Sequence, residues 1–108
     1  YVFLEKTDHA DTLVLLADFL MQISGVNRAL AAGVYGGKLV AVFRAGGLRL
    51  NVGRIAALAF SEYGSAGGHK NMARAEVPLE NLEARTRGSA AALSRFVQRR
   101  LAEALKAR

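Results

Sequence analysis

A glycine-rich segment in the second half of the chain carries the residues best suited to chemistry. Residues 64–71 read Gly-Ser-Ala-Gly-Gly-His-Lys-Asn. Successive glycines let backbone N–H groups converge on one anion, and a histidine and a lysine add side-chain donors beside them. Each donor to a charged phosphate oxygen is worth about 1.5–3 kcal/mol when it is well placed. The segment therefore predicts a phosphate-binding loop built from Gly67, Gly68, His69, Lys70 and Asn71.

Two familiar phosphate motifs do not fit this segment. A P-loop has Gly-Lys-Ser/Thr at the start of a helix, but His69 separates Gly68 from Lys70, and a strand is expected next. A dinucleotide-binding fingerprint places its glycines between a strand and a helix, whereas this loop leads from a helix to a strand. A glycine-rich turn without any ligand explains the same residues, so both interpretations stay open.

The apolar pattern predicts the elements that position this loop. Helices with apolar residues at i, i+3 and i+4 are expected over residues 8–24, 51–63 and 89–106. Strands are expected over residues 26–35, 38–44 and 72–79, the first two joined by a two-glycine hairpin turn. The order α-β-β-α-β-α predicts an α/β fold of α+β-like character, in which helices pack on a small mixed sheet containing a hairpin.

Local signals add detail to these elements. Asp8 and Asn51 are predicted to cap the first and second helices. Residues 38–44 are apolar on both faces, which indicates an inner strand, and Pro78 favours a strand end or an edge. The first helix is apolar around most of its circumference, so we expect it to be covered on more than one side. That helix also raises the possibility of a homo-oligomer.

Length and composition bound the class of protein. The chain has 108 residues, 52% of them hydrophobic and 22% charged, which predicts one folded domain over residues 1–108. Its first residue is not Met, which suggests a fragment of a longer protein. Absence of cysteine excludes disulfides, zinc–thiolate sites and cysteine nucleophiles. No run approaches the roughly 20 apolar residues of a membrane span, so a cytoplasmic domain with no membrane partner is expected.

Positive charge is concentrated after the first helix. The formal net charge is +6, yet residues 1–27 carry one Lys and four acidic residues, while the remainder carries fourteen basic and five acidic residues. This polarity favours an anionic partner for the later part. A group of arginines near the C-terminus could contact a nucleic-acid backbone, although solvation of a helix explains them as well: Arg85, Arg87, Arg95, Arg99 and Arg100.

Residues 66–74 resemble a known family. The run Ala-Gly-Gly-His-Lys-Asn-Met-Ala-Arg is similar to the Gly-Gly-Gly-His-x-x-Ala-Ala-Gly signature of the C-terminal, DHH-associated domain of DHH phosphoesterases. The form is most similar to exopolyphosphatase-related members, and the resemblance covers most of the chain. Three departures stand out: Ala66 replaces a glycine, Met72 replaces a small residue, and Arg74 stands where the family has glycine. Because of these departures, the substrate class of the oligoribonuclease branch of the family cannot be transferred to this chain.

The resemblance implies a division of labour between two domains. An N-terminal DHH domain of the same parent protein would hold manganese or similar divalent metals, while this chain would bind substrate and would hold no metal, no cofactor and no catalytic residue. Its substrate would be a short oligonucleotide, a nucleotide or polyphosphate. The residues implied in substrate binding are Gly67, Gly68 and His69, with Arg44 as a second anion contact and weaker roles for Lys70, Asn71 and Arg74.

Two alternatives to this hydrolase interpretation remain. The chain could be a non-catalytic nucleic-acid or anion-binding regulatory module that uses its C-terminal arginines. It could also be an oligomerisation domain that uses its apolar first helix. Asp8, His9 and Asp11 form a short polar cluster, but helix capping explains it better than a metal site does, so the fragment alone is expected to be inactive.

Overall fold

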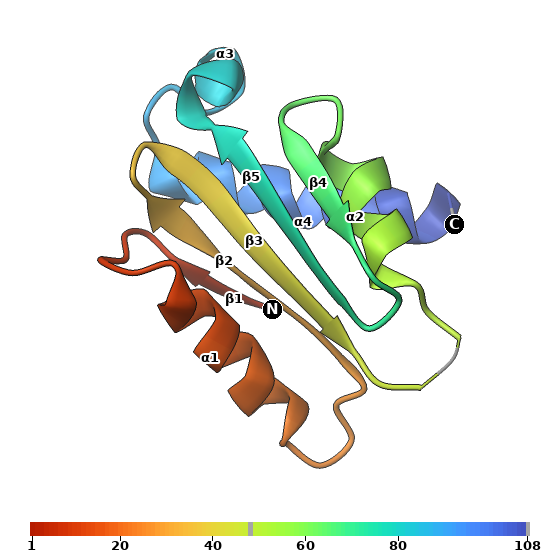
Figure 1. The fold of residues 1–108 in the computed structure, drawn as a ribbon. Coiled ribbons are helices and arrows are strands. Elements are labelled where there is room, and N and C mark those ends of the chain that lie inside the picture. Colours follow the sequence, from red (N-terminus) through yellow and green to blue (C-terminus); the bar gives the residue numbers. More distant parts are fainter. Residues whose placement is uncertain (48, 108) are drawn as a thin grey trace.

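Five strands form one mixed sheet in the computed structural model, which describes residues 1–47 and 49–107 (Figure 1). The strands are β1 (Val2–Leu4), β2 (Arg28–Tyr35), β3 (Lys38–Ala45), β4 (Ser65–Gly68) and β5 (Met72–Pro78). Their order across the sheet is β1-β2-β3-β5-β4. β1 is parallel to β2, and the other neighbouring pairs are antiparallel. The predicted fold class is therefore confirmed.

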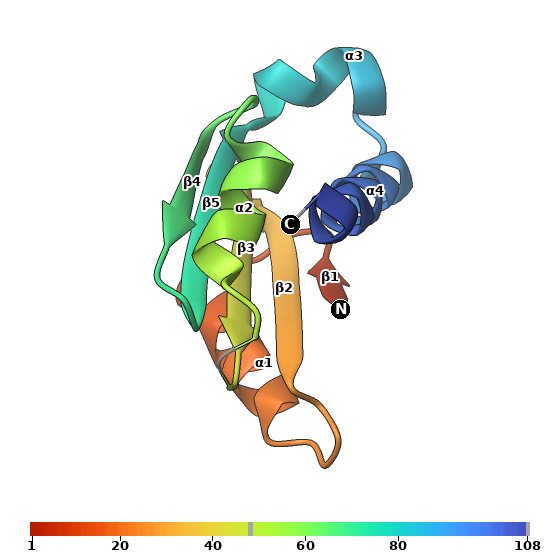
Figure 2. The ribbon, with the colours of Figure 1, turned by 90° about the vertical axis from the view of Figure 1, so that its right-hand side faces the viewer.

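Helices cover the two faces of this sheet unequally. They are α1 (Asp11–Met21), α2 (Val52–Phe60), α3 (Glu83–Thr86) and α4 (Ala90–Ala107), with a 3-10 turn, η1 (Leu79–Leu82), before α3. Figure 2 shows the sheet between α1 on one side and α2 with α4 on the other. α1 contacts β2 and β3. None of the described helices is both long enough and apolar enough to cross a membrane.

The larger part of the core lies between the sheet and the pair α2 and α4. There the rings of Phe43 and Phe60 meet edge to face at 6.2 Å between centroids, and Phe96 of α4 lies 6.4 Å from Phe60. A smaller cluster under α1 packs Leu13 and Ala17 against strand β3. Because β3 is buried on both faces and lies between β2 and β5, the predicted inner strand is confirmed.

The β2–β3 hairpin fixes which ends of the strands meet. Gly36 and Gly37 have φ values of +59° and +75°, the positive values that a two-residue primed turn needs. The register that starts from this turn places Arg28 opposite Ala45, next to Arg44. Both arginines therefore lie at the open end of the hairpin.

Several local predictions are wrong. The segment over residues 64–71, expected to be a loop, contains strand β4, because Ser65–Gly68 extends along β5 at the edge of the sheet. The short strand β1 and helix α3 were not predicted. Asp8 does not cap α1, whose N-cap residue is Ala10, whereas the Asn51 side chain does accept a hydrogen bond from the N–H of Arg54 at the start of α2.

The first helix is also less covered than expected. Leu15 and Phe19 on α1 are 68% and 63% exposed, because the sheet lies against one side of this helix alone. α1 contacts β2 and β3, and the residues of β5 that face the same side of the sheet are partly exposed. This uncovered corner between α1 and the β4–β5 hairpin is where the predicted site residues lie.

Candidate functional site

A groove of about 230 Å³ runs between α1 and the β4–β5 hairpin. Val14 of α1 and Val42 of β3 form its apolar wall, and Met72, which is 47% exposed, lies at the start of β5. The remaining lining includes five of the seven residues predicted from the sequence: Arg44, Gly67, Gly68, His69 and Arg74. Lys70 and Asn71 do not line the groove but form the exposed turn next to it.

The hairpin backbone does not form the expected nest of free N–H groups. The His69 N–H donates to the Met72 carbonyl at 2.7 Å, which closes the two-residue turn. β4 is extended, so its N–H groups alternate in direction instead of converging on one point. Any anion in this groove would therefore be held mainly by side chains, namely those of His69 and the two arginines.

The turn is instead used to hold the start of α2. The carbonyl groups of His69 and Lys70 accept hydrogen bonds of 2.9 Å from the N–H groups of Gly53 and Val52. With Asn51 accepting from the third N–H, the first turn of α2 is satisfied within the protein. The N-terminus of α2 is therefore not an anion site, but it fixes the position of the hairpin.

Arg44 is held at the groove by an acidic residue of α1. Its Nε lies 2.9 Å from Oδ1 of Asp18, close enough for an ion pair but without hydrogen-bond geometry, so the buried Nε has no hydrogen-bond partner among the described residues. The Arg44 side chain is 19% exposed. Its position at the end of β3 agrees with the sequence prediction, and Asp18 offsets part of its charge.

Arg74 faces the same groove from the middle of β5. Its Nε donates to Oε2 of Glu76 at 2.9 Å, and Lys38 lies 3.5 Å from the other oxygen of that carboxylate. Both side chains of the Arg74–Glu76 pair are more than 30% exposed, so water screens the interaction. Arg74 thus remains able to contact an anion in the groove.

Backbone hydrogen bonds bring four separate segments to one end of the molecule. Gly46 donates to the carbonyl of Asn27, and Ala45 donates to that of Asn71, while Val52 is bonded to Lys70 as described. These segments contain no Asp or Glu. We call this surface the basic end and define it by five cations: Arg28, Arg44, Arg49, Arg54 and Lys70.

Three residues of the basic end were not predicted from the sequence: Arg28, Arg49 and Arg54. All three are exposed, and none has an ion pair within the described part of the chain. The predicted hairpin could have identified Arg28, because a residue near the start of one hairpin strand must lie near Arg44 at the end of the other. Arg49 and Arg54 carried no such signal, since their place depends on how α2 packs.

The C-terminal arginines have partly structural roles. Arg100 donates to the carbonyl groups of Ala59 and Leu58 at 2.9 and 3.0 Å, and so satisfies the end of α2. Arg85 and Arg100 lie over the ring of Tyr63, at 5.1 and 5.7 Å from its centroid. Arg95 and Arg99 remain exposed on α4. Over residues 1–47 and 49–107, no three His, Asp or Glu side chains gather as a metal site.

Comparisons with known proteins give a fold relationship and no family. No family model matches the chain. It is 32% identical over 77 residues to the uncharacterized protein MJ1633 of Methanocaldococcus jannaschii, a match that covers 71% of this chain and 15% of that protein. Its fold is similar to the crystal structure of the C-Ala domain from Aquifex aeolicus alanyl-tRNA synthetase, with a TM-score of 0.59 and 20% identity. That match covers 78% of this chain and 82% of the other.

The fold match corrects the resemblance to DHH phosphoesterases. The solved structure named above is a domain of a tRNA synthetase, and no family model supports the phosphoesterase assignment. The nine residues that carried the resemblance proved to be an edge strand, a tight turn and the start of β5, a local arrangement that does not specify a phosphoesterase. The metal-bearing partner domain, the polyphosphate substrate and the hydrolase activity followed from that resemblance alone, so they are not carried further.

Proposed function

We propose that this domain binds nucleic acid through the basic end and the adjoining groove, and that it acts as a binding module without catalytic residues of its own. The observation that carries the proposal is the gathering of five cations from separate segments at the basic end. Of these five, Arg44 forms an ion pair with Asp18. A nucleic acid carries a phosphate on every nucleotide, and contacts between cations and these phosphates supply most of the sequence-independent binding. A cluster of cations on one surface is therefore suited to bind it. The similar fold belongs to a domain of alanyl-tRNA synthetase, an enzyme named for a tRNA, which agrees with this class of partner.

The groove adds an apolar surface to these charges. Val14, Val42 and the exposed Met72 line the groove together with Arg44 and Arg74. Guanidinium groups can bind phosphates, while apolar side chains can contact sugars and bases. Phosphate contacts at the basic end would position the nucleic acid, and the groove would then contact one neighbouring nucleotide.

Salt dependence distinguishes this surface from the arginines of α4. We would measure the affinity for a fluorescent RNA hairpin by anisotropy over a range of KCl concentrations, for the wild type and two triple variants. The first variant, Arg49→Gln/Arg54→Gln/Lys70→Gln, removes three exposed charges from the basic end. The matched control, Arg95→Gln/Arg99→Gln/Lys106→Gln, removes three exposed charges from α4.

The two variants should behave differently. Because each lost phosphate contact lowers the slope of log K against log [KCl] by about 0.7–0.9, the first variant should lose about 2 from the slope, whereas the control should keep the wild-type slope. If the control variant lost slope and the first variant did not, the nucleic-acid interface would lie on α4. Absence of measurable binding by the wild-type protein at low salt would refute nucleic-acid binding.

A further inference from the structure

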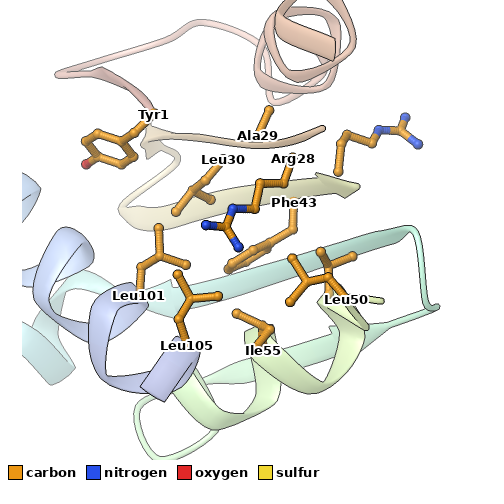
Figure 3. Close-up of a pocket in the computed structure, with 11 residues that line it drawn as sticks. Tyr1, Arg28, Ala29, Leu30, Phe43, Leu50, Ile55, Leu101 and Leu105 are labelled. Atoms are coloured by element: carbon orange, nitrogen blue, oxygen red, sulfur yellow. The ribbon is translucent and has the colours of Figure 1, made fainter. Parts of the chain in front are cut away.

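A second hollow lies on the opposite face of the sheet from the groove. It has a volume of about 260 Å³ and lies between the start of β2, helix α2 and the C-terminal half of α4 (Figure 3). Its lining is mostly apolar and includes Leu30, Phe43, Ile55, Leu101 and Leu105. Close-packed interiors leave few voids larger than a water molecule, so a hollow of this size is unusual in a small domain. It has room for a small ligand group.

The hollow exists because α4 is anchored on α2 rather than on the sheet. Arg100 is bonded to the end of α2, and the Tyr63 ring meets Phe96 edge to face at 5.2 Å. Beyond these contacts, Leu101 and Leu105 are only partly buried and face the hollow across from Leu30. The C-terminal half of α4 thus forms a wall of the hollow without closing it.

Tyr1 borders the same hollow at the side of β1. Its hydroxyl group lies 3.0 Å from the Ser94 hydroxyl, which ties it to α4. Burial raises the pKa of the Tyr1 phenol, and the hydrogen bond with Ser94 opposes that shift. The aromatic wall on this side is therefore neutral, and the positive charge at the hollow comes from arginine.

Arg28 supplies that charge. Its guanidinium group points toward the hollow from the start of β2 (Figure 3). Leu50 and Ile55 line both this hollow and a shallower one that Arg49 and Arg54 border. An apolar interior therefore opens directly onto the basic end, and the three arginines beside it have no ion pair within the described residues.

We infer that this hollow receives one unstacked base of a single-stranded nucleic acid, with the phosphates on either side of that base held by Arg28, Arg49 and Arg54. The inference rests on the proposed function and adds the class of nucleic acid. Bases that are not in a duplex are recognised by stacking on aromatic rings and on flat guanidinium groups. Arg28 offers a flat guanidinium group at the hollow, while Phe43, which is 2% exposed, belongs to its apolar lining. Arg49 and Arg54 are the neighbouring cations that match the adjoining phosphates.

The test compares a single strand with a duplex of the same sequence. Leu105→Phe adds a ring to the hollow, and Leu101→Phe does so from the preceding turn of α4. Leu58→Phe, on an exposed position of α2 outside the hollow, is the matched control. Thermal unfolding identifies which hollow-filling variant keeps its fold, and that variant is used. Affinity is measured by anisotropy, and side-chain methyl NMR signals report whether the single strand reaches Ile55 and Leu101.

We expect the wild type and the Leu58→Phe control to bind the single strand about 10-fold more tightly than the duplex, with shifts at both methyl-bearing residues. The hollow-filling variant should lose this preference and keep its affinity for the duplex. Equal single-strand affinity in the wild type and the folded variant would overturn the inference while leaving nucleic-acid binding intact. Octanoate is titrated as a second probe of the hollow. If octanoate shifts the methyl signals and the single strand does not, the inference is likewise overturned, and the hollow would bind an alkyl acid. No binding of either nucleic acid would overturn both proposals.

Discussion

Replacement of Gly53 by alanine would test how the β4–β5 hairpin is fixed to α2. A Cβ atom at this position would lie 2.8 Å from the carbonyl oxygen of Gly68 and 2.9 Å from that of His69. Both are backbone atoms, so the added methyl group cannot be accommodated by rotating a side chain. The helix would have to move away from the turn, lengthening the hydrogen bonds from Gly53 and Val52 to the turn carbonyls.

The size of the effect follows from three contributions. Overpacking costs about 1–3 kcal/mol, and the loss of two backbone hydrogen bonds costs about 1 kcal/mol each. Alanine in place of glycine returns about 1 kcal/mol through helix propensity. The free energy of unfolding should therefore fall by about 2–4 kcal/mol. For a domain of this size, this corresponds to a decrease in Tm of roughly 8 °C or more.

Urea unfolding followed by far-ultraviolet circular dichroism measures this change. Gly67→Ala is the matched control, because a Cβ at Gly67 would meet nothing within 4 Å. Its free energy of unfolding should stay within about 0.5 kcal/mol of the wild type. If Gly53→Ala proved as stable as the wild type or more stable, helix propensity would outweigh the contact. The close approach of α2 to the hairpin would then not be what fixes it.

Two further predictions concern the groove and helix α4. A Cβ at Gly67 would meet nothing within 4 Å, so Gly67→Glu adds a carboxylate at the groove and should weaken RNA binding about 10-fold. Gly67→Gln should stay within about threefold of the wild type, and equal affinities for the two variants would exclude the groove from the interface. Arg100→Ala would leave the carbonyl groups of Ala59 and Leu58 without their donor and should cost about 1–3 kcal/mol in urea unfolding, whereas Arg99→Ala should cost less than about 0.5 kcal/mol; similar values for the two would contradict the structural role of Arg100.

Local signals in the sequence determined much of the secondary structure. The Gly36-Gly37 turn was predictable because only glycine adopts two consecutive positive φ values at low cost. Asn51 was predictable as a helix cap because its side chain acts within three residues of the backbone. The inner position of β3 followed from apolar residues on both of its faces. The positive charge of the later part also favoured an anionic partner, the class to which the proposed nucleic acid belongs.

Interactions between distant residues decided the rest. Glycines at positions 67 and 68 fit a loop as well as a strand, and pairing with β5 selected the strand. The exposure of Phe19 was hidden from the sequence because it depends on how much of α1 the sheet covers. Arg28, Arg49 and Lys70 carry no common motif, and their segments come to the same end of the molecule only through the packing of β2, α2 and the hairpin. The sequence by itself determined that this protein is positively charged, and the tertiary structure decided where that charge is concentrated, because strand pairing and helix packing join segments that local propensities cannot relate.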